Sequence, residues 1–301
     1  MTGYSGQRWG VDCSCLMYKA RGSGLSATTV IASLLVRLRR ANIDTVFVFD
    51  GRPPVAKAAV VEQRRVVRTA VHKEMAEIRT GLEATDLTVT EKADMEHRHA
   101  LLQKKAPTVT YGEKDEIKRF LYAAGIQFIT ASGEADDVLA LLCRNGTLKG
   151  IITSDMDMLA RGVPAIVIPE TADATVLTEI RLDDVLSGLH LTYPHFVDAC
   201  MLMGSDYSAK DWKPVEPKDA VEMAKKGVDW SALDPSGEMV AGGMLLRGDG
   251  VEWESMVNEK QRAKWLMGSP PREPETIHSL ATANSWPMDW IGVLLGEPGF
   301  P

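Results

Sequence analysis

Short apolar segments alternate with amphipathic segments over the first two thirds of the chain. Residues 45–49 read Thr-Val-Phe-Val-Phe, which predicts a buried strand, and the runs at 9–12, 150–155 and 165–168 predict three more. Between them, residues 28–40, 115–124 and 135–144 repeat apolar positions every three or four residues, as amphipathic helices do. Strands that alternate with helices predict an α/β fold with a central, mainly parallel sheet flanked by helices. Such a sheet binds its ligand beyond the carboxyl ends of the strands.

Two parts of the chain break this rhythm. Residues 81–110 are polar, charged and weakly periodic, and either a helical insertion or a plain surface loop fits them. After Tyr207 the pattern degrades, with a break at residues 213–217, a helix predicted over 217–226, and recurring Gly and Pro from Trp230 onward. We therefore expect one domain over residues 1–210 and a second region over residues 211–301.

The charge is divided unevenly along the chain. The net charge is −7, but residues 1–125 carry 20 Lys/Arg against 14 Asp/Glu, and the remainder carries 14 against 27. A basic first part indicates a polyanionic partner, although a solvated basic helix beside an acidic tail explains the same numbers. The apolar runs are too short to cross a membrane, the N-terminus has no apolar secretion signal, and four cysteines are too few for a disulfide framework. We expect an intracellular protein.

Acidic residues fall where the predicted sheet would present its site. Three follow strands, three open the helix at 135–144, and two more lie near an apolar segment; these eight are Asp12, Asp50, Asp155, Glu134, Asp136, Asp137, Asp157 and Asp206. Taken singly, each is explained as a helix cap or a turn residue. Glu134 and Asp137 would share one helix face and Asp136 would not. Together they predict a cage of oxygen ligands, which selects hard cations such as Mg²⁺ or Mn²⁺.

A carboxylate cage that holds two divalent ions suits phosphodiester hydrolysis in particular. Lys57 and Arg64 are seven residues apart after Pro54, so on a helix they would face the same side. Both could then reach one scissile phosphate, and we predict them as catalytic residues. A solvent-facing basic stripe on a helix is the alternative for this pair.

Five motifs in order resemble the flap endonuclease superfamily of structure-specific 5′ nucleases, over roughly residues 9–207. They are Val11-Asp-Cys-Ser14 with Tyr18, Val48 to Pro54 with Lys57 and Arg64, Glu134 to Ala140, Thr153 to Leu159, and Leu189 to Tyr207. The resemblance implies a catalytic domain of the PIN-like 5′ nuclease fold and two Mg²⁺ ions, for which Mn²⁺ can substitute. It also implies cleavage of DNA at junctions of single and double strands.

The same resemblance assigns nucleic-acid contacts. Tyr18 would stack on a base beside the scissile phosphate, and residues 81–110 take the place of a helical arch that admits a 5′ end. The basic residues expected to contact nucleic acid are Arg65, Arg68, Lys92, Arg98, Lys104 and Lys105. Relatives grip duplex DNA with a helix–two-turn–helix, a glycine-rich hairpin and a potassium ion. Here Pro214-Val-Glu216 replaces the glycines, which argues against the potassium site and predicts a degenerate motif followed by a C-terminal extension.

The partner predicted from the resemblance is branched or flapped DNA. An RNA-directed nuclease of the same superfamily is one alternative, because the carboxylate cage does not itself exclude a 2′-hydroxyl. A non-catalytic nucleic-acid-binding scaffold is the other. The C-terminal residues contain no recognisable sliding-clamp peptide, and residues 290–295 are better explained as a packing segment. We expect no membrane partner, and we expect the protein to work where DNA is replicated.

Overall fold

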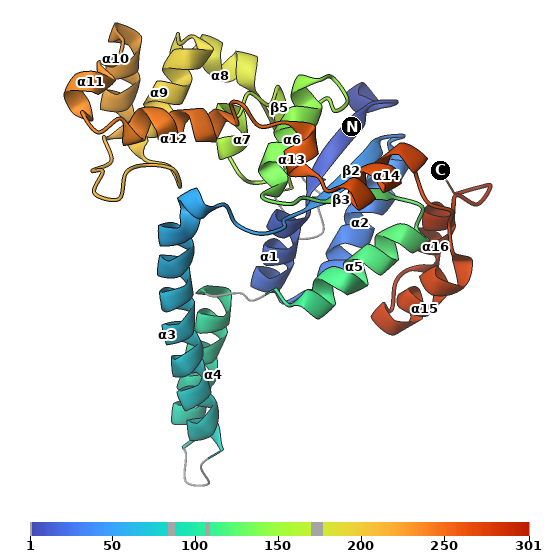
Figure 1. The fold of residues 1–301 in the computed structure, drawn as a ribbon. Coiled ribbons are helices and arrows are strands. Elements are labelled where there is room, and N and C mark those ends of the chain that lie inside the picture. Colours follow the sequence, from blue (N-terminus) through green and yellow to red (C-terminus); the bar gives the residue numbers. More distant parts are fainter. Residues whose placement is uncertain (1, 84–87, 106–108, 170–176, 301) are drawn as a thin grey trace.

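A six-stranded sheet organises the molecule (Figure 1). The structure is a computed structural model that describes residues 2–83, 88–105, 109–169 and 177–300. The strands are β1 (Arg8–Asp12), β2 (Asp44–Phe49), β3 (Gln127–Thr130), β4 (Ile151–Ile152), β5 (Ala165–Pro169) and β6 (Leu177–Arg181), in the order β3-β2-β1-β4-β5-β6. All neighbours pair in parallel except β5 and β6, which pair antiparallel. The predicted mainly parallel sheet is confirmed.

Helices surround this sheet and extend well beyond it. They are α1 (Cys13–Ser23), α2 (Ala27–Arg40), α3 (Ala58–Leu82), α4 (Val89–Lys105), α5 (Tyr111–Ala123), α6 (Ala135–Arg144), α7 (Asp157–Ala160), α8 (Leu182–Leu189), α9 (Tyr193–Met203), α10 (Pro217–Lys226), α11 (Trp230–Leu233), α12 (Glu238–Arg247), α13 (Trp253–Met256), α14 (Glu259–Met267), α15 (Pro274–Asn284) and α16 (Met288–Leu295), with 3₁₀ turns η1 (Thr2–Tyr4) and η2 (Val55–Lys57). Among the described residues, no helix is long and apolar enough to cross a membrane.

The two faces of the sheet are packed by different helices. Successive side chains of a strand point to opposite faces, so Phe47 and Phe49 join the core under α2, α5, α15 and α16, whereas Val46 and Val48 join the core under α6, α7, α9 and α12. The segment over residues 290–295 lies in the first of these cores, where Ile291 and Leu294 are buried. Its prediction as a packing segment is confirmed.

A helical hairpin stands out from the body of the molecule (Figure 1). It consists of α3 and α4, which pack against each other through a small apolar cluster centred on Val71, Ile78 and Leu102. The prediction placed the insertion at residues 81–110, but the hairpin already begins with α3 at Ala58. The boundary was wrong because α3 continues directly from the basic segment after Pro54. The helix has exposed side chains along its whole length, so the sequence pattern does not change where the helix leaves the body of the molecule. Residues 84–87 and 106–108 lie outside the described residues.

The last third of the chain is more regular than its sequence pattern indicated. The helix predicted over residues 217–226 is confirmed as α10, which packs on α9. From Trp230 onward the chain forms α11 to α16, of which α11 and α13 have only four residues each. Helices this short are below the roughly 11 to 18 residues over which helical periodicity is detected. Helices α15 and α16 pack against α5 and α2. The domain boundary near residue 210 stays a prediction.

Two loops at the carboxyl edge of the sheet lie in direct backbone contact. The Gly51 and Arg52 N–H groups donate to the carbonyls of Gly133 and Ser132 at 2.7 and 3.0 Å, so the loop after β2 is bound to the loop after β3. A Cβ on Gly51 would lie 2.1 Å from the carbonyl oxygen of Ala131, which leaves no room for a side chain. This contact sets Asp50 beside the start of α6, where Glu134 lies.

We expect Gly51→Ala to lower the free energy of unfolding by about 2 kcal/mol or more, because backbone atoms must move apart to accept the methyl group. Gly188→Ala is the matched control, since nothing lies within 4 Å of its added Cβ. It should leave stability unchanged or raise it by up to about 1 kcal/mol, because Gly188 is helical. Urea unfolding of both variants measures the difference, and equal values for the two would contradict the close contact.

Candidate active site

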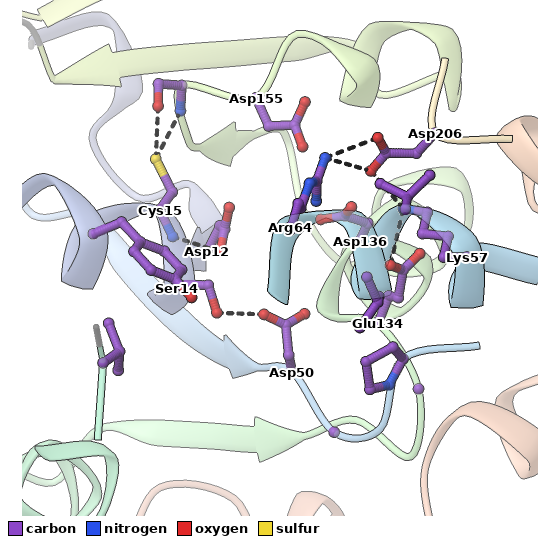
Figure 2. Close-up of a pocket in the computed structure, with 18 of the residues that line it drawn as sticks. Asp12, Ser14, Cys15, Asp50, Lys57, Arg64, Glu134, Asp136, Asp155 and Asp206 are labelled. Atoms are coloured by element: carbon purple, nitrogen blue, oxygen red, sulfur yellow. Dashed lines mark hydrogen bonds and ion pairs between the residues drawn. The ribbon is translucent and has the colours of Figure 1, made fainter. Parts of the chain in front are cut away.

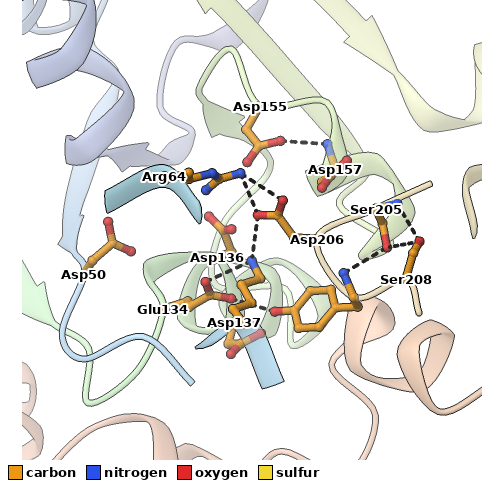
Figure 3. Close-up of polar contacts among 12 residues, drawn as sticks. Asp50, Arg64, Glu134, Asp136, Asp137, Asp155, Asp157, Ser205, Asp206 and Ser208 are labelled. Atoms are coloured by element: carbon orange, nitrogen blue, oxygen red, sulfur yellow. Dashed lines mark hydrogen bonds and ion pairs between the residues drawn. The ribbon is translucent and has the colours of Figure 1, made fainter. Parts of the chain in front are cut away.

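A cavity of about 970 Å³ opens at the carboxyl edge of the sheet (Figure 2). Six of the eight predicted metal-binding carboxylates line it, together with both predicted catalytic bases; they are Asp12, Asp50, Glu134, Asp136, Asp155, Asp206, Lys57 and Arg64. These residues come from the ends of β1 and β2, the N-cap and first turn of α6, the loop after β4, the loop after α9, and the η2–α3 segment. Asp157 lies next to this group, on the first turn of α7 (Figure 3).

Asp12 is the most deeply buried carboxylate of this cavity, with 7% of the residue exposed. It caps α1 by accepting from the Cys15 N–H at 3.1 Å, and it accepts from the Thr153 hydroxyl at 3.0 Å. Burial raises the pKa of Asp12 to about 6, and the nearby charges of Asp50 and Asp155 add to the increase. Burial likewise raises the pKa of Asp136 well above its usual range. The charged carboxylates are therefore crowded in a poorly solvated place.

Hydrogen bonds from neighbouring loops fix the carboxylates at the rim. Asp50 accepts from the Ser14 hydroxyl and from the Ala135 N–H, the latter at 2.9 Å. Asp155 accepts from the Asp157 N–H at 2.9 Å, and its own N–H donates to Thr153. The side chains are thus oriented by α1, α6 and α7 before any ligand binds. Neither Ser14 nor Thr153 was among the predicted site residues, although both belong to the motifs.

The two predicted catalytic bases converge on one acid. Lys57 Nζ lies 2.9 Å from Glu134 and 3.5 Å from Asp206, and Arg64 donates to both oxygens of Asp206 at 2.8 and 3.1 Å. Burial alone would lower the pKa of Lys57, but the hydrogen bond and charge of Glu134 outweigh it and raise the pKa. Lys57 ends the 3₁₀ turn η2 rather than lying on α3, yet it reaches the same carboxylate as Arg64.

A buried arginine, Arg161, which sequence reasoning missed, lies among the acids on the inner side of the site. The Arg161 side chain is 1% exposed; it pairs with Asp137 and lies 3.6 Å from Glu134 and 4.0 Å from Asp136. Arg161 also donates to the Tyr207 hydroxyl at 3.0 Å, which in turn donates to Glu134 at 2.6 Å. Burial would lower the pKa of Arg161, but Asp136 and Asp137 more than offset this and raise it.

The helix-face expectation for the third motif does not match the geometry. Glu134 is the N-cap of α6, with an extended backbone at φ −86° and ψ 144°, so helical spacing does not apply to it. Glu134 and Asp136 line the cavity, whereas Asp137 faces Arg161 and is absent from the lining. One feature of the sequence could have indicated this arrangement: Arg161 directly follows the apolar segment 158–160. An arginine in that position is more simply interpreted as a surface residue.

The predicted nucleic-acid contacts are spread from the cavity to the hairpin. Tyr18, Arg65 and Arg68 line the cavity, and Tyr18 is 42% exposed. Arg98 lies on α4 and pairs with Glu74 of α3, and Lys92 is exposed near the start of α4. The side chains of Lys104 and Lys105 lie outside what the structure describes.

The donor set of the cavity fits hard divalent cations. Its candidate ligands are carboxylate oxygens; burial raises the pKa of Asp12, and the charges of Asp50 and Asp155 raise it further. Within the described part of the chain, no three acidic, histidine or cysteine side chains are yet close enough together to hold an ion. Glu134 and Asp206 are instead paired with Lys57 and Arg64. Ion binding at these two acids therefore competes with the two bases.

Comparison with known sequences finds the XPG I-region family model over residues 125–206. Flap endonuclease 1 of Encephalitozoon cuniculi is 31% identical over 239 residues, which cover 74% of this chain and 66% of that protein. Flap endonuclease 1 of Mus musculus is 28% identical and is matched over 92% of this chain and 78% of its own length. The chain spans about half to two thirds of the length of the first three curated relatives that it matches.

Solved structures share the fold. Flap endonuclease-1 from Methanococcus jannaschii matches with a TM-score of 0.67 at 20% identity, over 98% of this chain and 93% of that one. The catalytic core of Rad2 in complex with DNA substrate matches with a TM-score of 0.60 at 20% identity, over 98% and 92% of the two chains.

We expect the metal-free protein to lose stability as the pH rises from about 4 to about 6, because folded Asp12 holds its proton more tightly than the unfolded chain does. Asp12→Asn removes this penalty, worth on the order of 3 kcal/mol above pH 6. In chelator, the variant should exceed the wild type in free energy of unfolding at pH 7.5 and match it near pH 4. Asp94→Asn, an exposed charge on α4, is the control. If the free energy of unfolding of the wild type changes with pH no more than that of Asp12→Asn, the raised pKa of Asp12 is refuted.

Arg161→Met should cost roughly 3–5 kcal/mol, because it leaves Asp137 without its buried counter-charge and Glu134 with Lys57 alone. The double variant Arg161→Met/Asp137→Asn should recover part of that loss. Arg181→Met, which removes an exposed pair with Glu179, should cost less than about 1 kcal/mol. Urea unfolding in chelator compares the three, and a loss at Arg161 no larger than at Arg181 speaks against the network.

Proposed function

The chain belongs to the flap endonuclease superfamily of 5′ nucleases, and from that premise we propose that it is a metal-dependent, structure-specific 5′ nuclease. It would hydrolyse phosphodiester bonds of DNA at junctions of single and double strands, as a flap endonuclease and 5′ exonuclease do. One observation supports this above all others: six carboxylates and two bases from separate segments line a single cavity at the carboxyl edge of the sheet.

The eight predicted acids are proposed as the metal-binding set, with Asp137 acting on it indirectly through Arg161. Two Mg²⁺ ions, or Mn²⁺ in their place, would supply hydroxide from a bound water and stabilise charge on the phosphate. Asp12 and Asp136 contribute the deepest negative charge, and Asp50 and Asp155 are oriented by backbone N–H groups. Asp206 would become available when exposed Arg64 turns to the substrate, whereas Glu134 would bind an ion beside the fixed charge of Lys57.

The two bases differ in exposure, and this assigns them different tasks. The Lys57 side chain is 9% exposed and lies 4.4 Å from the ring of Tyr207, so its position is set by packing. The Arg64 side chain is 62% exposed, and its ion-pair partner among the described residues is Asp206. We therefore propose that Lys57 provides a positive charge at a fixed position beside the scissile phosphate. Arg64 would exchange Asp206 for two phosphate oxygens, since a guanidinium binds them bidentately.

Substrate entry is proposed to occur beneath the α3–α4 hairpin. Tyr18, Arg65 and Arg68 line the cavity on that side, which suits a base stacked on an aromatic ring and a strand passing basic side chains. The proposed partner is branched or flapped DNA, and the protein would act where DNA is replicated or repaired. We propose that the degenerate helix–two-turn–helix lies within residues 211–301 and includes α10, and with Glu216 before α10 we propose no potassium site there.

Purified protein with Mg²⁺ should cut a DNA flap faster than a matched RNA flap or linear RNA. Asp155→Asn should reduce the cleavage rate by at least about a hundredfold. Loss of a residue that only hydrogen-bonds to a metal ligand already costs about 10- to 100-fold, and loss of the ligand itself should cost more. Asp94→Asn on α4 should cut at the wild-type rate. Fastest cleavage of linear RNA would favour the RNA-directed alternative. Absence of cleavage on all three substrates would favour the non-catalytic scaffold.

A further inference from the structure

A second groove runs beside the edge strand β3, between α5 and α14, and no predicted site residue lines it. Its volume is about 630 Å³, and its walls come from α5, β3, α14 and the start of α15; the lining residues are Asp115, Lys118, Arg119, Tyr122, Phe128, Thr130, Gln261, Lys264, Glu273 and Thr276. Both helices pack on β3, so the groove has a rigid floor.

Three basic and two acidic side chains line this groove. Burial lowers the pKa of Lys118, and the neighbouring charges of Lys114 and Lys264 lower it further, against the attraction of Asp115. Asp115 and Glu273 border the groove, yet among the described residues none of the nearby bases forms an ion pair; these are Lys114, Lys118, Arg119 and Lys264. Like charges held together in this way favour an anion.

Successive turns of α5 line the carboxylate cavity and this groove. Lys114 lines that cavity, Lys118 lines the groove one turn farther along α5, and Tyr122 follows after another turn. Residues four apart share a helix face, so these three form one line. Helix α5 runs from the base of the α3–α4 hairpin toward α15 and α16 (Figure 1). The line therefore leads away from the proposed cleavage site.

An exposed aromatic ring stands at the far end of this line. Tyr122 is 42% exposed, and with Phe128 and Lys264 it also lines an adjoining cavity of about 320 Å³. Lys118 is held over the ring of Phe49 at 5.0 Å, which leaves its ammonium group fixed rather than free in solvent. A basic track with an exposed aromatic platform is how proteins bind single-stranded nucleic acid without reading its sequence.

We propose that the α5–α14 groove binds a single-stranded segment of nucleic acid that leads away from the cleavage cavity. Its phosphates contact Lys118, Lys264 and Arg119, and one base stacks on Tyr122. The inference rests on the proposed function, because it extends the path of the same substrate. It adds a strand-binding surface on the side of the sheet opposite to α9 and α10.

The test measures binding of a fluorescein-labelled 30-nucleotide DNA strand to the full chain in chelator, by anisotropy over a salt series. Lys118→Gln/Lys264→Gln should weaken binding about tenfold at low salt. It should also reduce the slope of log K against log salt by about 1.4, for two lost phosphate contacts. Tyr122→Ala should weaken binding about fivefold or more without changing the slope, because stacking releases no counterions.

Lys149→Gln is the control for loss of a lysine outside the groove, since Lys149 is exposed just before β4, at the amino edge of the sheet. It should leave the affinity and the slope unchanged, and Lys118→Arg should restore wild-type binding by keeping the charge. The groove is refuted if the double variant binds within about twofold of Lys149→Gln with the same salt slope. If the protein cuts none of the substrates, the proposed function is refuted, but the binding measured in chelator still tests the groove. If binding does not depend on the groove, the groove is refuted, but the cleavage assay still tests the proposed function.

Discussion

Mutual repulsion of carboxylates at the carboxyl edge of the sheet is the constraint on which the rest of this structure depends. Parallel strands deliver Asp12 and Asp50 to one edge, and the loops around α6 and α9 add Glu134, Asp136 and Asp206. These positions follow from the topology, so the acids cannot separate without opening the sheet. Uncompensated buried charge costs several kcal/mol per ion, and cations must therefore be supplied from the protein or from solution.

The protein itself supplies three positively charged side chains, and these differ in how deeply they are buried. The side chains of Arg161, Lys57 and Arg64 are 1%, 9% and 62% exposed. A fully buried guanidinium tied to Asp137 and Tyr207 cannot exchange partners, so Arg161 is a permanent part of the fold. The outer two hold the acids only through pairs that metal ions and a phosphate can replace. Burial thus separates structural from reactive positive charge within one site.

The sequence predicted the site better than the parts that surround it. Asp12, Asp50 and Asp155 follow β-branched or apolar strands, a local signal that survives in a single sequence. Strand β3, of four residues, and β6, with its exposed polar side chains, gave no comparable signal. Arg161 was missed because its burial depends on Tyr207 and Asp137, which are distant in sequence. The hairpin boundary failed because α3 is one uninterrupted helix of 25 residues that leaves the body without a break in pattern.

The net charge is a poor guide to what this protein binds, because many of its acidic side chains lie in the site rather than on the outer surface. The eight predicted ligands account for a large part of the acidic excess; six of them line the cavity, and Asp137 pairs with buried Arg161. Bases are placed in the opposite way: Arg65 and Arg68 lie at the cavity, and Lys118 and Lys264 lie along the α5–α14 groove. A polyanion approaching these surfaces meets positive charge locally although the chain is negative overall, since fields beyond about 10 Å are screened at physiological salt.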